Sequence, residues 1–299
     1  MTNQRLLLLQ THSGLHTGQP QAPDRLSRDP ESGRPILRPA SLLGALRKQI
    51  RDQLYSRYQD QSDWKSAANQ DEHLTTLFGP PRQPGQAAEP GALAATTGQL
   101  LLLPVRSLQG GFTWVSSPGV LAALALNLAT LDLEPLPELP TLHPFEALCH
   151  ESHAGLLEGQ HLLLEELSFQ RRGDMPKLTS WLSQIGLLGG LPVAAQLPKH
   201  LVLISDTAFD HFMRYATVPM VRGQFDPEGS QRNQRLQHIE MLPPDAWLYS
   251  LLNLDGEYDW DPYLASIPSH LYLGSHRTTG HGLCALSLIP PTPTPQEAA

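Results

Sequence analysis

The sequence predicts an α+β fold built on antiparallel sheets, with large insertions. Short apolar runs that are typical of buried strands alternate irregularly with stretches of helical spacing. The steady strand–helix alternation of a parallel doubly wound sheet or barrel is absent. Pro- and Gly-rich segments separate the runs, and we find no internal repeat.

Apolar runs bounded by polar, Gly or Pro residues predict the strands. In chain order these are Arg5–Thr11, Gln99–Val105, Phe112–Val115, His161–Ser168, His200–Ser205, Val218–Arg222, Arg235–Met241, Trp247–Leu252, Leu271–Gly274 and Leu283–Ile289.

Capping residues followed by apolar positions at helical spacing predict the helices. The first begins at Ser41, with Pro39 just ahead of it, and runs to about Tyr58. Its apolar positions are Leu43, Leu46, Ile50 and Leu54. The others are Asp71–Phe78, Pro118–Leu131, Lys177–Leu188, a helix capped by Asp206 that ends near Tyr215, and a short piece within Tyr258–Ile267.

We predict a single domain over residues 1–289. Residues 59–98 and 132–175 are interpreted as loop or insertion segments, because they are polar or Pro-rich. Within the first, Gly79–Gly98 has no burial pattern and is expected to be a mobile connector. The tail, residues 290–299, is expected to be disordered.

Composition indicates a cytoplasmic globular protein with no membrane association. The chain is 40% hydrophobic and 17% charged, and its apolar runs are too short to span a bilayer. The N-terminus lacks the features of a signal peptide. Two cysteines, Cys149 and Cys284, cannot form a disulfide framework.

The net charge of −8 argues against a generic nucleic-acid binder, but its distribution is uneven. Residues 1–60 carry nine Lys and Arg against five Asp and Glu, a net +4, which leaves −12 for the rest. Local charge sets the field over a binding face. The basic segment is therefore compatible with a nucleic-acid-binding face, and the acidic remainder would suit surfaces that meet protein.

The stretch Gly14–Lys48 concentrates the polar residues of this basic segment. A Gly/Pro-punctuated loop brings His16 together with Asp24 and Asp29, residues suited to acid–base work or to holding a divalent ion. The start of the following helix, with Ser41 and Gly44, could receive a phosphate. The simpler interpretation is a solvated polar turn followed by an ordinary helix start.

Two further clusters carry weaker signals. Cys149-His150-Glu151-Ser152-His153 has metal-ligating residue types but no recognised ligand spacing, and a metal-dependent hydrolase using His150, Glu151 and His153 is a remote alternative. The loop Gly274–Gly282, GSHRTTGHG, allows close backbone approach to a ligand. Gly-rich hairpin turns are common, however.

Taken together, the motifs resemble one known family, the backbone subunit of type III-B CRISPR–Cas (Cmr) effector complexes, in the superfamily of repeat-associated mysterious proteins. The resemblance covers nearly the whole chain, and its most specific part is the block that begins at Leu103. The matching segments are Leu15–Gly18, Asp24–Arg28, Gly33–Ile36, Ser41–Arg47, Leu77–Pro80, Leu103–Gly110 with Phe112, Trp114 and Ser117-Pro118, Glu240–Ser250 and Gly274–Gly282.

The resemblance implies an RRM-like (ferredoxin-type) palm with insertions forming fingers and a thumb. Copies of the chain would stack along a CRISPR RNA, beside other type III subunits, and cleave target single-stranded RNA at regular intervals. The chemistry implied is a Mg²⁺- or Mn²⁺-dependent attack by a 2′-OH that leaves a 2′,3′-cyclic phosphate. By motif, Asp24 is the catalytic residue and metal ligand, with His16 beside it.

The remaining site residues come partly from the matched motifs and partly from basic residues outside them. The expected subunit-interface residues are Arg106 and Ser107. The expected RNA-binding residues are Arg38, Ser41, Gly44, Arg47, Lys48, Arg222, Thr278, Gly280 and Gly282. His161–Arg172 and Arg214–Arg235 are candidates for the thumb or other RNA-facing edges.

The sequence departs from the family pattern at several positions. Leu43 stands where the family carries Lys, and Arg277 stands where it carries Glu. Arg-Leu-Ser follows Asp24 in place of the family's residues, so Asp29 competes for the catalytic role. An alternative function is therefore a catalytically inactive scaffold for CRISPR RNA in the same type of complex.

Overall fold

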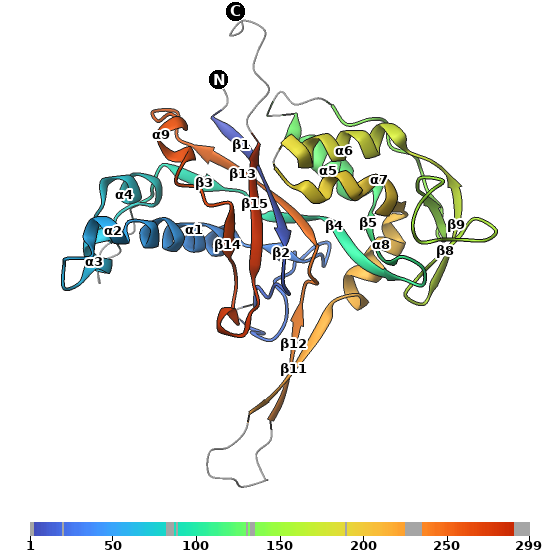
Figure 1. The fold of residues 1–299 in the computed structure, drawn as a ribbon, viewed down its shortest axis with the longest axis horizontal. Helices are drawn as coiled ribbons and strands as arrows, with labels where there is room; N and C mark the ends of the chain where they lie inside the picture. Colours follow the sequence, from blue (N-terminus) through green and yellow to red (C-terminus); the bar gives the residue numbers. More distant parts are fainter. Residues whose placement is uncertain are drawn as a thin grey trace, which may run out of the picture.

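The fold was analysed in a computed structural model, which describes residues 3–19, 21–81, 87, 89–129, 131, 135–188, 190–224 and 235–289. Their strands form one 13-stranded sheet and one two-stranded ribbon, and helices pack on both sides of the large sheet (Figure 1). The predicted α+β class is confirmed. The predicted tail at 290–299 lies outside the described residues.

The centre of the large sheet is β1 (Gln4–Thr11), which pairs antiparallel with a strand on each side. Because it is buried on both faces, its sequence is a continuous Leu6–Leu9 run without alternation. Its neighbours are β13 (Trp247–Leu254) and β15 (Leu283–Ile289), and the shorter strands around them are β14 (His270–Tyr272), β3 (Leu93–Ala95) and β2 (Ile36–Leu37).

The long strand β4 (Gly98–Ser107) belongs to both halves of the sheet. Its first part pairs with β13 around Leu100 and Leu102, and its second part pairs from Leu103 onward with the next strand, β5. The second half consists of β5 (Gly111–Ser116), β10 (Leu201–Ile204), β6 (Glu146–Leu148), β9 (Leu167–Gly173), β8 (His161–Leu164) and β7 (Leu156–Leu157).

The helices form two groups at opposite sides of the central strands (Figure 1). The first group is α1 (Pro39–Gln53), α2 (Tyr55–Tyr58), α3 (Trp64–Asn69) and α4 (Glu72–Phe78). The second is α5 (Pro118–Leu128), α6 (Pro176–Leu188), α7 (Leu197–His200) and α8 (Asp206–Tyr215), while α9 (Asp261–Leu264) lies near the top of the view.

A β-ribbon extends away from the body of the molecule, at the bottom of Figure 1. It consists of β11 (Val218–Gln224) and β12 (Arg235–Met241), which pair antiparallel along their full lengths. Both strands were predicted from the sequence. The hairpin's connecting residues, 225–234, lie outside the described part of the chain.

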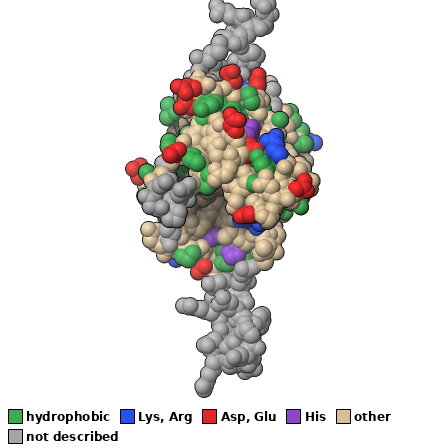
Figure 2. Space-filling model, turned by 90° about the vertical axis from the view of Figure 1, so that its left-hand side faces the viewer, with side chains coloured by type: hydrophobic (Ala, Val, Ile, Leu, Met, Phe, Trp, Pro, Cys, Tyr) green, Lys and Arg blue, Asp and Glu red, His purple; other side chains and the backbone are tan. Residues whose placement is uncertain are grey.

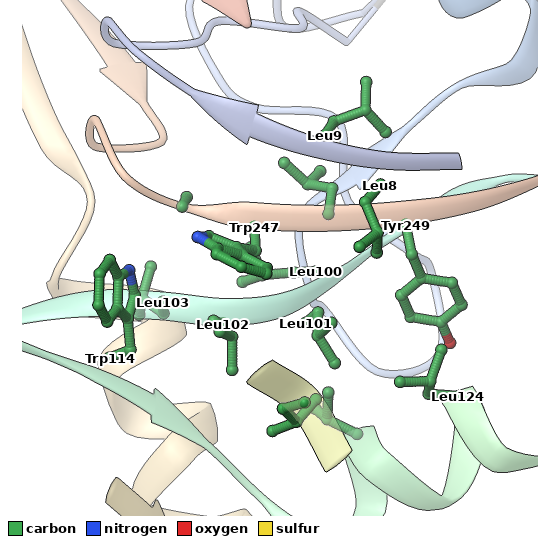
Figure 3. Close-up of a cluster of buried hydrophobic side chains, with 14 of the residues drawn as sticks. Leu8, Leu9, Leu100, Leu101, Leu102, Leu103, Trp114, Leu124, Trp247 and Tyr249 are labelled. Atoms are coloured by element: carbon green, nitrogen blue, oxygen red, sulfur yellow. The ribbon is translucent and has the colours of Figure 1, made fainter. Parts of the chain in front are cut away.

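The main core lies where the two halves of the sheet meet. Leu100–Leu103 of β4, Trp114 of β5, Trp247 of β13 and Leu124 of α5 belong to one cluster of buried side chains (Figure 3). The two indole rings meet edge to face, with centroids 6.3 Å apart. The residues that predicted separate strands thus form one continuous apolar layer.

Three predicted boundaries are wrong for identifiable reasons. The first helix begins at Pro39, because proline's fixed φ suits the first helical turn, and it ends at Gln53. The predicted strand His161–Ser168 is two strands, since a turn at Glu165, with a positive φ, divides them. The connector Gly79–Gly98 contains β3, which pairs with β13 despite its small side chains.

The two core tryptophans allow a matched test of hydrogen bonding. Trp114 Nε1 donates to Asp245 O at 2.7 Å, whereas Trp247 Nε1 has no partner among the described residues. We expect Trp114→Phe to destabilise the protein more than Trp247→Phe by about 0.5–1.5 kcal/mol, because only the former removes a hydrogen bond, one that is partly buried. Urea unfolding measures both, and equal losses would contradict the assigned bond.

Candidate functional site

The polar loop between β1 and β2 is folded against the root of the β11–β12 ribbon. Isolated bridges join Leu15 to Leu242 and, within the loop, Gly18 to Leu26. Leu15 and Leu26 are fully buried, which anchors the loop at two points. The polar residues between them are therefore held in place by packing.

Glu240 of β12 makes the largest number of described contacts to this loop. Its backbone N–H donates to Asp24 O at 2.8 Å, and its carboxylate accepts from Leu26 N at 3.1 Å. The same carboxylate pairs with the Arg28 guanidinium and accepts from Thr217 Oγ1. Glu240 thus holds the loop backbone by hydrogen bonds and holds the Arg28 side chain by an ion pair.

His16 lies under the loop, with 1% of its surface exposed. Its Nδ1 is 2.6 Å from Glu240 O and its Nε2 is 2.7 Å from Pro23 O. Both ring nitrogens therefore face backbone carbonyls of the chain. In this position the imidazole holds the loop to β12 and is out of reach of a bound molecule.

Asp24 is half-buried at the edge of an open cleft of 590 Å³. This volume lies in the range of about 300–1,000 Å³ that is usual for ligand sites. The cleft runs between the loop, the end of α8 and the root of the ribbon. Its other lining residues are Arg25, Arg28, Gly33, Arg214, Tyr215, Thr217, Pro219, His238, Ile239 and Glu240.

Asp29, the competing candidate, lines a different pocket. Its Oδ1 accepts hydrogen bonds from Ser32 N at 2.8 Å, Ser32 Oγ at 2.9 Å and Glu31 N at 3.1 Å. The hydrogen bonds from Ser32 lower its pKa most. This is an Asx turn, in which the carboxylate is already engaged by its own loop.

The Gly-rich loop 274–282 packs directly on the His16 loop. Gly274 has φ +71°, and a Cβ there would lie 2.0 Å from His16 O. Ser275 N donates to the same oxygen at 3.1 Å, and Gly282 N donates to Gly14 O at 2.9 Å. The glycines at 274 and 282 are thus explained by contacts within the chain, whereas Gly280 has open space around it.

The predicted RNA-binding residues of α1 lie in different environments. Arg38 occupies the N-cap position without a side-chain cap, and Ser41 lies inside the first turn. Gly44 is exposed, with no atom within 4 Å of the position that a Cβ would take. Contacts within the described chain therefore do not explain why this helical position lacks a side chain.

Arg47 and Lys48 differ although they are adjacent. Arg47 donates to Phe78 O and Gly79 O at 3.2 and 2.9 Å, and burial lowers its pKa. It ties α1 to the end of α4. Lys48 is exposed, pairs with Asp52, and lines a 370 Å³ groove together with Tyr272, Arg277 and Thr278.

The other predicted residues are placed as follows. Arg106 is exposed and pairs with Glu165 at 3.0 Å, whereas Ser107 is buried against Gly155. Arg222 lies on β11 opposite Gln237. A surface role in subunit contacts thus suits Arg106 better than Ser107.

The cluster around His150 is not gathered into a metal site. His153 is buried, accepts from Gly155 N through Nδ1, and places Nε2 2.9 Å from Thr113 Oγ1. Burial raises the pKa of the Cys149 thiol to about 11. In the described ranges, no group of three His, Cys, Asp or Glu residues could hold a metal, at Asp24 or elsewhere.

Sequence reasoning missed three features of the cleft. Tyr215 falls in the range Arg214–Arg235 that was predicted to hold thumb or RNA-facing edges, but it was not singled out; 70% of its surface is exposed and it lines the cleft. His238 and Glu240 lie two residues apart on β12, so both side chains point to the same face of the strand. This alternation is visible in the sequence, but the sequence does not show that the Asp24 loop packs against this face of β12.

The fold and the cleft define a mixed α+β protein in which an acidic loop residue, several arginines and an exposed aromatic meet at the root of a projecting hairpin. The chain belongs to the RAMP superfamily, whose sequence model matches residues 8–285. Among the described residues, no helix has the length and apolar content needed to cross a membrane.

The chain is also similar to individual characterised proteins. It is 24% identical over 292 residues to the CRISPR system Cmr endoribonuclease Cmr4 of Pyrococcus furiosus, covering 94% of this chain and 92% of that one. The crystal structure of oligomeric Cmr4 from Pyrococcus furiosus superimposes with a TM-score of 0.72, at 21% identity, over 97% and 98% of the two chains.

A second solved structure is similar at lower identity. It is a cryo-EM structure of the type III-B Cmr-beta complex bound to cognate target RNA, in which one chain matches with a TM-score of 0.65 at 14% identity. The match covers 95% of this chain and 96% of that one. These likenesses establish the shared fold.

The buried His153 predicts acid sensitivity. Burial lowers its pKa to about 4 from an ordinary 6.5, so the folded state favours the neutral ring. The stability that this lowered pKa contributes is fully present above pH 6.5 and is lost as the pH falls toward 4. The change amounts to about 3 kcal/mol, because each pKa unit corresponds to about 1.36 kcal/mol.

We therefore expect the free energy of unfolding to fall more steeply between pH 6.5 and pH 4 in the wild type than in His153→Gln. Urea titrations at several pH values measure the difference. Parallel pH profiles for the two proteins would show that His153 does not titrate in this range.

Proposed function

We propose that this chain is the backbone subunit of a type III-B CRISPR–Cas effector complex in the cytoplasm, and that it cleaves target RNA at Asp24. The observation that carries the proposal is the position of Asp24. It lies half-buried at the edge of a cleft that also holds three arginines, on a loop fixed by Glu240 and His16. The whole-length similarity to Cmr4 supports it.

The proposed chemistry is transesterification of the RNA backbone. The Asp24 carboxylate accepts the proton of a ribose 2′-OH, and the 2′-oxygen attacks the adjacent phosphorus. The arginines of the cleft stabilise the charge that develops on the phosphoryl oxygens. Since His16 cannot reach the substrate, we assign it a positioning role, in which its imidazole links the loop at Pro23 to β12 at Glu240.

A divalent cation fits this proposal only when RNA is present. Mg²⁺ is commonly held by one or two carboxylates together with substrate phosphates, and Asp24 offers one carboxylate. A Mg²⁺ or Mn²⁺ ion bound there would supply Lewis-acid stabilisation of the phosphate.

The remaining parts of the fold suit roles along an RNA filament. We interpret the central strands β15, β1, β13 and β4, with their covering helices, as the RRM-like palm, and the β11–β12 ribbon as the thumb (Figure 1). The exposed ring of Tyr215, at the root of the ribbon, offers a stacking surface for a base of single-stranded RNA.

The surface charge indicates which faces meet RNA. At the end of the molecule where α2 and α3 lie, acidic side chains are scattered over the surface and the few basic ones do not gather (Figure 2). The basic residues Arg277 and Lys48 instead lie together in the groove between α1 and the Gly-rich loop. We assign this groove to the CRISPR RNA backbone, and the acidic faces to neighbouring subunits.

The catalytic assignment is tested by Asp24→Asn in the assembled complex. We expect target RNA to bind normally while regularly spaced cuts are lost, because the amide cannot accept the 2′-OH proton. Asp29→Asn is the matched control, and it should cleave at the wild-type rate. Denaturing gels of labelled target RNA measure both.

Reversed results for the two variants would transfer the catalytic role to Asp29. A wild-type complex that binds target RNA but never cuts it would establish the alternative function, an inactive scaffold. The altered residues that follow Asp24 are the sequence feature that favours this second candidate.

Gly44 provides a test of the RNA-binding face that separates binding from stability. Glycine inside a helix costs roughly 0.5–1 kcal/mol relative to good helix formers. Because the space around Gly44 is open, Gly44→Leu should raise the free energy of unfolding by about this amount. We expect it to weaken CRISPR RNA binding at least tenfold, since the side chain occupies the path of the RNA.

Thermal unfolding and filter binding measure these two effects. Gly33→Ala is not a suitable control, because Gly33 has φ +70°. Ala122→Leu, at an exposed position of α5 in the second group of helices, is the better comparison. Unchanged RNA affinity in Gly44→Leu would remove this face from the proposed interface.

A further inference from the structure

Transesterification needs two proton transfers, and the proposed function assigns only one of them. As the 2′-oxygen forms its bond to phosphorus, the bond from phosphorus to the 5′-oxygen breaks. That 5′-oxygen leaves as an alkoxide unless an acid protonates it. The sequence offered His16 as the second group, but its two ring nitrogens face Glu240 O and Pro23 O beneath the loop.

The cleft contains another imidazole, that of His238 on β12. His238 is exposed, whereas the next residue, Ile239, is buried. Strand alternation therefore places His238 on the same face as Glu240. The Glu240 backbone N–H is hydrogen-bonded to Asp24 O. Asp24, on the loop, and His238, on β12, therefore line the same cleft from two different elements.

The spacing along β12 suits groups that act on opposite sides of one phosphate. Residues two apart on a strand are separated by about 6–7 Å, and Glu240 N donates to Asp24 O at 2.8 Å. The backbone of His238 therefore lies about that far along the ribbon from the residue that holds the Asp24 backbone, so the two side chains enter the cleft from separate positions. In an in-line displacement the attacking and leaving oxygens lie on opposite sides of phosphorus, which calls for this kind of separation.

The other described residues around the cleft are less suited to donate this proton. Arg25, Arg28 and Arg214 keep their protons throughout the physiological range. Glu240 is engaged by Arg28 and the loop backbone. Imidazole is the side chain that ordinarily exchanges a proton between pH 5 and 8.

We propose that His238 is the general acid of this site, paired with Asp24 as the general base; the inference rests on the proposed function. Asp24 takes the proton of the 2′-OH, the 2′-oxygen bonds to phosphorus and the bond from phosphorus to the 5′-oxygen breaks. His238 gives its proton to the departing 5′-oxygen. The products are a 2′,3′-cyclic phosphate and a 5′-hydroxyl, and no further reactant is needed.

The test uses a target RNA in which sulfur replaces the 5′-bridging oxygen at the cut site. A thiolate leaves readily without protonation, so a general acid becomes dispensable while the general base does not. Wild type, His238→Asn and Asp24→Asn are compared in the assembled complex under single-turnover conditions. His143→Asn, an exposed histidine that does not line the cleft, is the control.

We expect His238→Asn to slow cleavage of the ordinary RNA by about 10²–10⁴-fold, the usual contribution of a positioned acid. On the sulfur substrate it should stay within a few-fold of wild type. Asp24→Asn should be slow on both substrates, and His143→Asn on neither.

Two outcomes would overturn the inference alone. One is wild-type cleavage of ordinary RNA by His238→Asn. The other is an equal loss on both substrates, which would show that His238 positions the RNA or the ribbon. A wild-type complex that cuts neither substrate would refute the proposed function itself, and this inference with it.

Discussion

The shared strand β4 is the constraint on which the rest of the fold depends. Its residues Leu100–Leu103 pair with β13 on one side and with β5 on the other, and they are buried between the helices of the second group and the central strands. A single continuous strand therefore fixes the relative orientation of two half-sheets. The positions of the loops that connect the two half-sheets therefore depend on this strand.

The loop that carries Asp24 is held in place by strands that continue into these half-sheets. β13 continues from the ribbon, so Glu240 reaches the loop from a strand whose continuation is anchored in the core. The loop is also held from below by the Gly-rich segment, since Gly274 and Ser275 pack on His16 O. A carboxylate on such a loop is preorganised, which favours catalysis by positioning.

The departures from the family pattern gain a physical context in the fold. Leu43 is half-buried and contacts the core, so the cation expected there is replaced by packing. Further along α1, Lys48 lines a groove together with Tyr272 and Arg277, and Arg277 stands where the family carries an acid. This groove therefore holds two basic side chains.

Much of the fold was predictable from local patterns. The Leu6–Leu9 run, the stretch that forms α8 and the two ribbon strands were all visible as periodicity or capping, because short-range sterics decide them. The cap of α8 is Ser205, however, and not the predicted Asp206. Where the pattern was ambiguous, tertiary contacts decided. β3 exists only because β13 offers it a partner, and the break after Leu164 is set by a residue in a left-handed conformation.

For the candidate site too, some features follow from the sequence and others depend on the tertiary structure. The sequence by itself determined the residue types of the loop, the glycines that let it close and the motif that singles out Asp24. The Asx turn that engages Asp29 is also a local feature, because its partners lie two and three residues further along the chain. Only the tertiary structure decided that His16 is buried between two carbonyls. It also decided that Glu240 and His238 face the same cleft as Asp24, because residues more than 200 positions apart are brought together by strand pairing, which no local pattern encodes.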